Sequence, residues 1–531
     1  ISQIKLALDE SKELLPKKIK KKLGNNIDIK DYKIVKESID ARDKSDIRLV
    51  YTIDFDIEQR KGFEKPALKP NPKKNFSIAP DMSYKAAVPG VRELKHRPVI
   101  VGFGPCGIFC ALILAQQGYR PIVLERGKCV SKRTEDVQRF WNDGYLNTES
   151  NVQFGEGGAG TFSDGKLTTG IKDTRIYKVL SEFVSAGAPE EILYKNKPHI
   201  GTDLLRDVVA NLREEIIRLG GEIRFSNKLI GIDAPSGEIK AAEVQDILNG
   251  KSYVLETEKL VLAIGHSARD TFRYAHELGI EMSAKPFSIG VRIEHPQEMV
   301  DEAQYGKTKG LPPAEYKLSY RCKNGRGVYT FCMCPGGEVI MSSSQEGGVV
   351  TNGMSNHSRD SGTANSGLLV DVRFSDFDGD DALAGVEFQE KYERLAYKNG
   401  GGRYAFPKTC WADFRDGDEG AKAVIDSLPD FAVESIREAM PHLGRKLKGF
   451  DADNAVMKAV ETRSSSPVRF FRDDTLQGSI KGLYPAGEGA GYAGGITSAA
   501  CDGIKVAERI IEECYFKEKL CKGGKIERKA L

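Results

Sequence analysis

The order of hydrophobic and polar residues predicts both strands and helices in this chain. Short apolar runs at 98–101, 122–124 and 259–265 indicate buried strands, because a strand covered on both faces has no polar side to expose. Apolar residues at helical spacing across 203–219 predict an amphipathic helix, whereas alternation over 47–57 predicts a strand with one buried face. The pattern therefore predicts an α/β protein.

The first ninety residues have a pattern of their own. A basic run at 17–22 lies in a predicted helix, and 31–35 and 47–57 alternate like strands, so we expect a small α+β domain. We interpret its lysine-rich face as a solvated surface, because aromatic residues do not interleave with the charge. A surface that meets RNA or an acidic partner is the alternative. Two proline-containing stretches, 65–74 and 80–89, predict a linker.

The stretch 97–127 contains a strand, a glycine turn, a helix and a second strand in the order typical of dinucleotide binding. Gly102 permits the tight turn, Gly104 lets the backbone approach a pyrophosphate, and Gly107 lets the helix pack closely on the strand. The free N–H groups at the helix N-terminus attract phosphates. Glu125 follows about 20 residues later, where an acid accepts hydrogen bonds from ribose hydroxyls. A glycine-rich surface turn, the alternative, would not account for the helix and the acid.

Length and composition bound the class of protein. With 531 residues, 40% of them hydrophobic and 29% charged, the chain is typical of a globular protein of two or three domains. The net charge of +3 requires no polyanionic partner, although basic residues exceed acidic ones in 1–97. The 10 cysteines lie mostly in apolar segments, which favours reduced packing residues over disulfides. Because no apolar run approaches about 18 residues and no signal-peptide core begins the chain, we expect a cytoplasmic protein without a membrane partner.

A second glycine-rich segment follows the dinucleotide motif. Residues 155–160 contain too much glycine for a regular helix or strand, so we expect a loop whose backbone closely approaches another group. This segment, GEGGAGTFSDGKL, resembles a bacterial group of FAD-dependent dehydrogenases, often labelled NAD(FAD)-utilizing dehydrogenases. So do PFSIGVRIEHPQ at 286–297, FCMCPGGEV at 331–339 and TRSSSPVR at 462–469. The resemblance extends over nearly the whole chain.

The resemblance implies noncovalently bound FAD in a Rossmann-like domain of the glutathione-reductase type. Pro105 and the ending Glu125-Arg126-Gly127 resemble FAD-binding rather than NAD-binding proteins. Leu229 matches the position whose backbone touches adenine, and 483–488 matches the motif whose acid meets the ribityl or pyrophosphate end of FAD. The N-terminus of a helix beginning near 494–497 would point at the flavin ring and stabilise negative charge there. The expected cofactor-binding residues are Gly102, Gly104, Pro105, Cys106, Gly107, Glu125, Arg126, Arg133, Gly158, Leu229, Gly265, Gly487, Glu488, Gly495, Ile496 and Thr497.

Residues 273–450 change to mixed short strands, glycine turns and scattered helices, which we interpret as an inserted α+β substrate or cap domain. Cys332 and Cys334 would share one face of a strand. We favour small buried residues over a redox pair there, because CxC disulfides are strained. Dispersed histidines and the lack of zinc spacing predict no metal site. We interpret His266, in the loop after an apolar strand, as structural.

Two residues are expected to carry the chemistry. Arg463 lies in a polar segment, and its planar donor fork would hold an anionic or carbonyl-bearing substrate. Lys166, from the glycine loop, would donate a proton or stabilise charge, because ammonium pKa values fall readily in desolvated sites. The expected substrate-binding residues are Glu156, Asp164, Arg292 and His295.

The predicted function is that of an FAD-dependent oxidoreductase, which moves a hydride or electron pair between flavin and a small molecule. NAD(P)H is a candidate partner, although the chain has one dinucleotide motif and no CxxC pair. One alternative is an FAD enzyme that binds RNA through its basic N-terminal domain, which we consider the weaker hypothesis. The other is a flavin-binding protein without turnover. Substrate and oligomeric state stay open. The predicted layout is an N-terminal domain (1–90), a discontinuous FAD-binding domain (97–272 and 451–514), the insertion (273–450) and a tail (515–531).

Overall fold

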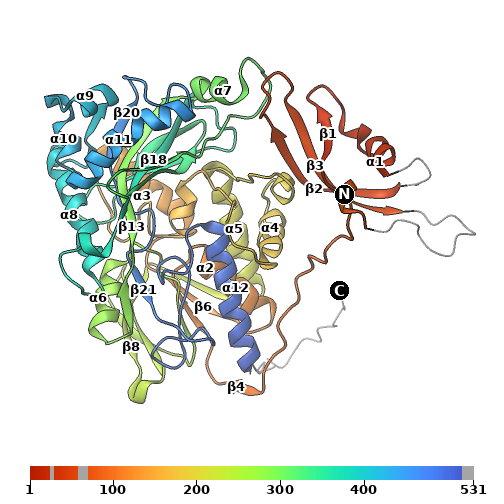
Figure 1. The fold of residues 1–531 in the computed structure, drawn as a ribbon. Helices are drawn as coiled ribbons and strands as arrows, with labels where there is room; N and C mark the ends of the chain where they lie inside the picture. The colour runs from red at the N-terminus through yellow and green to blue at the C-terminus, as the bar shows by residue number, and fades with distance from the viewer. Residues whose placement is uncertain (24–28, 58–69, 517–531) are drawn as a thin grey trace, which may run out of the picture.

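The computed structural model describes residues 1–23, 29–57 and 70–516, which form a mixed α/β fold (Figure 1). The N-terminal unit consists of β1 (Ile4–Ala7), α1 (Leu15–Leu23), β2 (Ile29–Asp40) and β3 (Arg48–Ile57). Its strands form an antiparallel sheet in the order β1-β3-β2. Helical spacing places Leu15 and Ile19 of α1 on one face, and both are buried in a cluster with Leu6 and Ile53 of the sheet.

The N-terminal sheet contacts the rest of the chain through the middle of β2. The N–H of Glu37 donates to the carbonyl of Tyr194 at 2.7 Å, and the N–H of Asn196 donates to the carbonyl of Glu37 at 2.8 Å. The Glu37 carboxylate also pairs with Lys12 at 2.7 Å and Lys195 at 3.1 Å. Backbone pairing and charge thus join this sheet to the body.

The segment 77–91 runs from this sheet to the body without a helix or strand (Figure 1). It leads into β4 (Arg92–Leu94), which pairs in parallel with the last strand, β23 (Cys514–Phe516). Residues 65–69 of the first predicted linker, and 517–531 of the predicted tail, lie outside the described residues.

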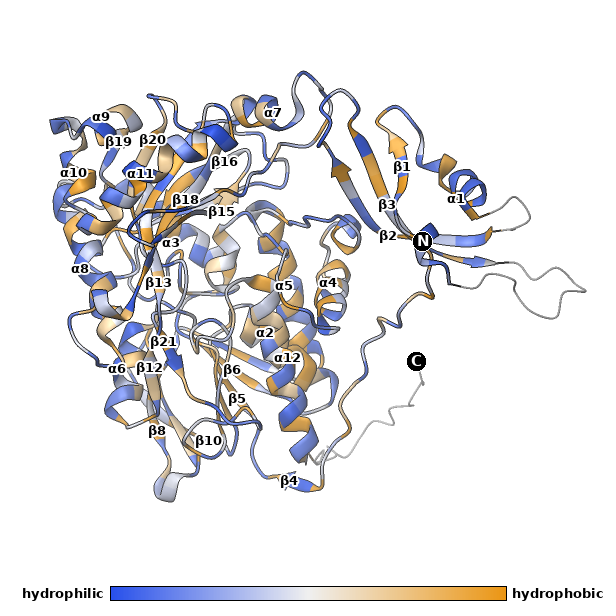
Figure 2. Ribbon diagram, in the orientation of Figure 1, coloured by the Kyte–Doolittle hydropathy of each residue, from blue (hydrophilic) through white to orange (hydrophobic). Residues whose placement is uncertain are grey.

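A parallel sheet in the order β22-β11-β5-β6-β7 forms the centre of the body. Its strands are β5 (Val99–Val101), β6 (Ile122–Glu125), β7 (Glu222–Phe225), β11 (Leu260–Leu262) and β22 (Leu483–Pro485). Successive side chains point to opposite faces of a strand. Ile100 and Val123 accordingly join the cluster under the helices, whereas Val99 and Leu124 join the cluster on the other face. Figure 2 shows hydrophobic residues along β5 and β6, as expected for strands covered on both faces.

Helices cover one face of this sheet and a small antiparallel sheet covers the other. The helices are α2 (Pro105–Gln116), α4 (Arg175–Ser185), α5 (Thr202–Arg218) and α12 (Ile496–Glu513), with α3 (Val130–Asp143) beside α5. The small sheet contains β8 (Asn227–Asp233), β9 (Ala241–Asp246) and β10 (Ser252–Glu256). A Cβ at Gly503 of α12 would lie 2.1 Å from the carbonyl oxygen of Cys106. Gly503 therefore allows α12 to approach the backbone of helix α2 closely.

The insertion is built on a six-stranded antiparallel sheet in the order β14-β15-β18-β13-β20-β19. Its strands are β13 (Phe287–Pro296), β14 (Ser319–Arg321), β15 (Gly327–Cys334), β18 (Thr363–Val372), β19 (Lys408–Cys410) and β20 (Val456–Glu461). A hairpin of β16 (Gly337–Met341) and β17 (Thr351–Ser355) lies beside them. The accompanying helices are α7 (Gln297–Tyr305), α8 (Ala384–Asn399), α9 (Trp411–Asp416), α10 (Lys422–Ile425) and α11 (Asp430–Lys446).

The chain enters and leaves this insertion side by side. After α6 (Arg269–Glu277), strand β12 (Met282–Ala284) leads in, and it pairs antiparallel with β21 (Val468–Phe470), which leads out. The predicted division at residue 450 cuts through the six-stranded sheet, because β20 comes after it and yet pairs with both β13 and β19. Hydrogen bonding along β20, which leaves no mark in the local sequence, accounts for this difference.

Among the described residues, we find no helix with the length and apolarity needed to cross a lipid bilayer.

Candidate functional site

A cavity of about 560 Å³ lies at the carboxyl ends of β5, β6 and β11, and residues of the glycine-rich loop and of the insertion form its other wall. This is the edge at which open parallel sheets bind ligands, and the volume falls in the usual range for ligand pockets. The wall contains these predicted residues: Gly102, Gly104, Pro105, Cys106, Glu125, Arg126, Gly158, Asp164, Lys166, Leu229, Gly265, Arg463, Glu488, Gly495 and Ile496. The predicted residues outside it are Gly107, Arg133, Glu156, Arg292, His295, Gly487 and Thr497.

The glycines between β5 and α2 have different roles. A Cβ at Gly107 would lie 1.9 Å from the carbonyl oxygen of Gly102, and a Cβ at Gly102 would lie 2.3 Å from that of Ala263. These two positions require glycine for packing. A Cβ at Gly104 would meet only the Cα of Gly158, at 3.7 Å. Gly104 is therefore the glycine at which a larger side chain would enter the cavity.

Two helices begin at this cavity. Gly104 precedes α2 and Gly495 precedes α12, and neither helix N-terminus has a side-chain cap. The first turn of a helix has backbone N–H groups without intrahelical partners and carries partial positive charge. A Cβ at Gly494 or Gly495 would meet no atom within 4 Å, so the second N-terminus is open as well. The cavity can therefore hold anionic groups at two places without any basic side chain.

The carboxylate of Glu125 accepts hydrogen bonds from backbone N–H groups of the protein itself. One carboxylate oxygen accepts the N–H of Phe103 at 2.8 Å, and the other accepts those of Gly127 at 2.8 Å and Gly155 at 3.0 Å. The carboxylate thus ties the glycine turn to the glycine loop, a role that sequence reasoning did not assign to it. A carboxylate has about four acceptor positions, so one remains for a ligand hydroxyl.

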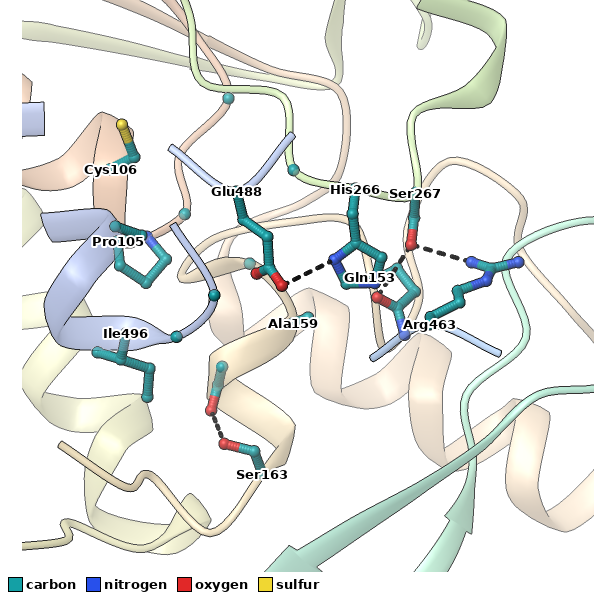
Figure 3. Close-up of a pocket in the computed structure, with 18 of the residues that line it drawn as sticks. Pro105, Cys106, Gln153, Ala159, Ser163, His266, Ser267, Arg463, Glu488 and Ile496 are labelled. Atoms are coloured by element: carbon teal, nitrogen blue, oxygen red, sulfur yellow. Dashed lines mark hydrogen bonds and ion pairs between the residues drawn. The ribbon is translucent and has the colours of Figure 1, made fainter. Parts of the chain in front are cut away.

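His266 lies in the wall beside Glu488 (Figure 3). Its Nδ1 is 3.7 Å from Oε1 of Glu488, and its buried Nε2 has no hydrogen-bond partner among the described residues. An unpaired buried polar atom costs about 1–3 kcal/mol, which a polar ligand atom would offset. The uncapped helix ends, the open Gly104 and this nitrogen together fit a bound dinucleotide. The sequence pointed to His266 only as a loop residue.

Arg463 does not offer its donor fork to the cavity. Its Nε and Nη2 donate to Glu393 at 3.0 and 2.8 Å, and its Nη1 donates to the hydroxyls of Ser267 at 3.0 Å and Ser344 at 2.6 Å. Arg269 donates to the same carboxylate at 2.7 and 2.8 Å. Figure 3 shows the contact of Arg463 with Ser267. The predicted substrate-binding fork is thus occupied by Glu393.

This buried cluster joins the two halves of the protein, because Arg269 begins α6, Glu393 lies on α8 and Arg463 follows β20. Burial opposes ionisation of Glu393, but Arg269 and Arg463 hold the pKa of that carboxyl well below its ordinary value. Glu393 is therefore ionised at neutral pH and neutralises one of the two cations.

Lys166 is held by acids of the loop and the insertion. Its Nζ lies 2.6 Å from Oδ2 of Asp164 and 3.5 Å from Oε1 of Glu315. Arg359 contacts both of these acids, at 2.6 and 3.0 Å. Burial opposes the charge, but Asp164 and Glu315 outweigh it and raise the pKa of Lys166 above its ordinary value. Of the two roles expected from the sequence, the raised pKa favours charge stabilisation over proton donation.

Two predicted residues support the glycine loop from behind. Arg133 is buried and donates to the carbonyls of Asn151 at 2.8 Å, Val152 at 2.8 Å and Glu156 at 2.7 Å. The Glu156 carboxylate pairs with Arg213 at 2.8 Å and is buried away from the cavity. These contacts fix the loop, and neither side chain faces a substrate.

The remaining predicted residues pack inside the protein. Arg292 is buried and forms a two-pronged pair with Glu461, at 2.8 and 2.9 Å. His295 is buried, and its Nε2 lies 2.8 Å from the carbonyl oxygen of Phe450. Gly487 donates to Asp502 at 2.7 Å, and Thr497 donates to the carbonyl of Leu167 at 2.8 Å. Their neighbours Glu488 and Ile496 line the cavity, whereas the motif 286–297, which contains Arg292 and His295, contributes no residue to its wall.

Two parts of the chain match known families. Residues 286–464 match a family described as FAD-dependent protein, C-terminal domain-like, and residues 1–56 match a domain of unknown function. The first match supports FAD as a cofactor. A protein of Clostridium beijerinckii described as uncharacterized is 49% identical over 534 residues, which is 97% of this chain and 98% of that protein. The chain belongs to the same family as this clostridial protein.

Solved structures of flavoproteins are similar over most of the chain. A flavin-dependent brominase variant is 14% identical, with 78% of this chain and 80% of that chain covered and a TM-score of 0.38. A glycerol-3-phosphate dehydrogenase from Bacillus halodurans, complexed with FAD, is 13% identical, with a TM-score of 0.36; the match covers 78% of this chain and 63% of that longer one. A geranylgeranyl bacteriochlorophyll reductase-like protein from Thermoplasma acidophilum is 13% identical, with 79% and 78% covered and a TM-score of 0.34.

Proposed function

We propose that this protein is an FAD-dependent oxidoreductase that transfers a hydride between noncovalently bound flavin and a small molecule. The observation that carries this proposal is the pair of uncapped helix N-termini, at Gly104 and Gly495, on the wall of one cavity. FAD has a negatively charged pyrophosphate, and its flavin ring becomes negatively charged on reduction. The positive end of a helix stabilises each of these two groups. This pairing supports an arrangement of the glutathione-reductase type.

The flavin supplies a two-electron centre when it is bound. The turn at Gly104 and the first turn of α2 would hold the pyrophosphate, and the free acceptor position of Glu125 would hold a ribose hydroxyl. Leu229 and Arg126 also line the cavity, and the backbone at Leu229 would contact the adenine. The first turn of α12 would face the ring and favour its negatively charged form.

The facing wall would receive the substrate. Lys166 keeps its charge beside Asp164 and Glu315, so it would orient an anionic or carbonyl-bearing molecule without giving up its proton. The buried cluster of Arg269, Glu393 and Arg463 would close the cavity where the two halves meet and exclude water from the ring. We propose an FAD-binding unit from 97–284 and 468–514, with the substrate unit between them.

Anaerobic titration of the purified protein with NADH and with NADPH, followed at the flavin absorbance band, tests this proposal. Bleaching by either nucleotide identifies the donor and supports an enzyme. If neither reduces the flavin, while dithionite does, the substrate is the donor or the protein only binds flavin. Absence of stoichiometric FAD after reconstitution would contradict the proposal itself.

A further inference from the structure

Cys332 turns into the cavity because strand β15 is irregular at that point. The pairing of β15 with β18 changes register between Phe331 and Cys334, so β15 contains one residue more than its partner there. Cys332 has a φ of 43°, a left-handed conformation that residues with a Cβ rarely adopt. Bulges commonly redirect a side chain beside an active site. Phe331, Cys332 and Met333 all line the cavity, whereas Cys334 is buried directly behind them.

The two cysteines share one set of charged neighbours. The thiol of Cys334 donates to the carbonyl of Cys332 at 3.3 Å. Nη1 of Arg292 donates to the same carbonyl at 3.0 Å and lies 4.0 Å from Sγ of Cys334. Arg292 is fixed by its two bonds to Glu461. The buried arginine is thus positioned against the cysteine pair.

These neighbours shift the pKa values of the two thiols in opposite directions. The Cys334 side chain lowers the pKa of Cys332 to about 6, burial opposes the change, Arg292 and Lys166 reinforce it, and Glu461 counteracts it. The pKa of Cys334 is raised well above its usual value. At neutral pH the pair therefore consists of a thiolate at the cavity wall and a thiol behind it. Reactive cysteines occur in such electropositive, partly exposed surroundings.

The backbone leaves room for this arrangement. A Cβ at Gly353 of β17 would lie 2.3 Å from Nη1 of Arg292 and 2.8 Å from Sγ of Cys334. Burial raises the pKa values of Cys106 and Cys110 in the same way, and there it prevails. At Cys332 the effects of Cys334, Arg292 and Lys166 outweigh burial.

We infer that Cys332 and Cys334 form a redox-active dithiol that exchanges an electron pair with the flavin in the cavity that both groups share. The inference rests on the proposed function. In the oxidising direction an S–S bond forms between the Cys332 thiolate and Cys334, and the S–H bond of Cys334 breaks. The electron pair and that proton pass to the oxidised flavin, which becomes the singly protonated reduced anion. One thiolate, one thiol and one oxidised flavin thus give one disulfide and one reduced flavin anion, so atoms, electrons and charge balance.

The span between the two cysteines permits the bond. Residues two apart in an extended strand lie about 6.6 Å apart at their Cα atoms, near the upper limit for a disulfide. The bulge bends the strand at this point, which changes the span from that of a regular strand. A strained disulfide of this kind is readily reduced, which suits a couple that must turn over in both directions.

The first test counts electrons in the full-length holoprotein. After mild oxidation with diamide and its removal, anaerobic titration with dithionite should consume four electrons per flavin in the wild type. Cys332→Ser and Cys334→Ser should each consume two. Cys410→Ser, a change of the same kind at a half-exposed cysteine of β19, should behave like the wild type. Equal consumption in wild type and both cavity variants would overturn the inference while the oxidoreductase proposal stands.

The second test does not require bound flavin. Alkylation with iodoacetamide across pH 5–9, followed by peptide mass spectrometry, should show Cys332 labelled several-fold faster than Cys129 at pH 7. Diamide should remove two hydrogens from the peptide that contains both cavity cysteines. If Cys332 reacts no faster than Cys129, or if no disulfide forms, the dithiol is contradicted whether or not FAD binds. Failure of FAD to bind contradicts only the proposed function.

Discussion

The two walls of the cavity are built by different means. The wall from the parallel sheet is mostly backbone, with a glycine turn, two helix N-termini, and Glu125 holding three N–H groups. The wall that faces it is mostly side chains. Lys166 pairs with acidic residues there, Arg463 pairs with Glu393, and Cys332 lies at a bulge. A backbone wall can receive a cofactor common to many proteins. A side-chain wall can be varied to receive a particular substrate.

The largest expected effect is on stability, in the wall made of side chains. Glu393→Gln leaves the guanidinium groups of Arg269 and Arg463 buried without their counter-charge. Breaking a buried pair in this way costs about 3–5 kcal/mol of the free energy of unfolding. Urea unfolding of the purified variant measures the loss, and Glu387→Gln, an exposed change on the same helix, is the control. Equal midpoints in both variants would show that the cluster does not join the two halves.

Glu125→Ala tests whether a side chain organises the backbone wall. The substitution leaves the N–H groups of Phe103, Gly127 and Gly155 without their acceptor, so we expect a loss of about 3 kcal/mol in the free energy of unfolding. Thermal unfolding of the apo-protein isolates this effect from that of FAD. Glu135→Ala, an exposed change on α3, should leave the midpoint unchanged. If the variant is as stable as the wild type and only binds FAD more weakly, Glu125 acts as a ligand residue and does not organise the backbone wall.

Gly104→Val tests the backbone wall without altering the fold. The backbone at Gly104 has φ −81° and ψ −175°, which valine adopts, and a Cβ there meets only Gly158 at 3.7 Å. The larger side chain enters the cavity, and we expect FAD affinity to fall by about 100-fold, or about 2.7 kcal/mol. Titration of apo-protein with FAD, followed by flavin fluorescence, measures this. Gly170→Val, at an open surface position, is the control, and equal affinities would remove Gly104 from the site.

The smallest expected effect is the acid dependence of the facing wall. Burial alone would raise the pKa of Glu315, but Lys166, Arg359 and Lys197 lower it from the ordinary 4.5 to about 2. Because the pKa is lower in the folded protein, its contribution is present above pH 4.5 and lost as the pH falls towards 2. Glu315→Gln should therefore reduce the loss of stability over that window, by about 1–2 kcal/mol. Acid titrations of wild type and variant are run in parallel. If their losses of unfolding free energy agree to within about 0.3 kcal/mol, the prediction is contradicted.

The same contrast explains what the sequence could predict. Gly102, Gly104 and Gly107 stand at fixed spacing beside an apolar strand, so the turn and helix they form follow from nearby residues. Their part of the cavity was therefore predictable. Asp164 and Lys166 come from a glycine loop that was also recognisable, and both line the cavity.

Residues of the facing wall depend on contacts across long stretches of chain. Arg463 was a reasonable candidate for substrate binding until Glu393, seventy positions earlier in sequence, was seen to occupy it. Glu315 and Arg359 have no local motif, and Cys332 faces the cavity only because a bulge redirects it. Strand β20 likewise joins the insertion by pairing with β13, and its own sequence does not indicate that partner.

The contact between α2 and α12 also bears on the order in which the protein is made. Gly503 of α12 lies against the backbone of Cys106 in α2, and β22 completes the sheet that begins with β5. A ribosome produces α2 before α12, with the whole insertion between them. The apolar surface of α2 must therefore wait for its cover, exposed to chaperones or to aggregation, while the insertion is made. The cavity is complete only when α12 has emerged.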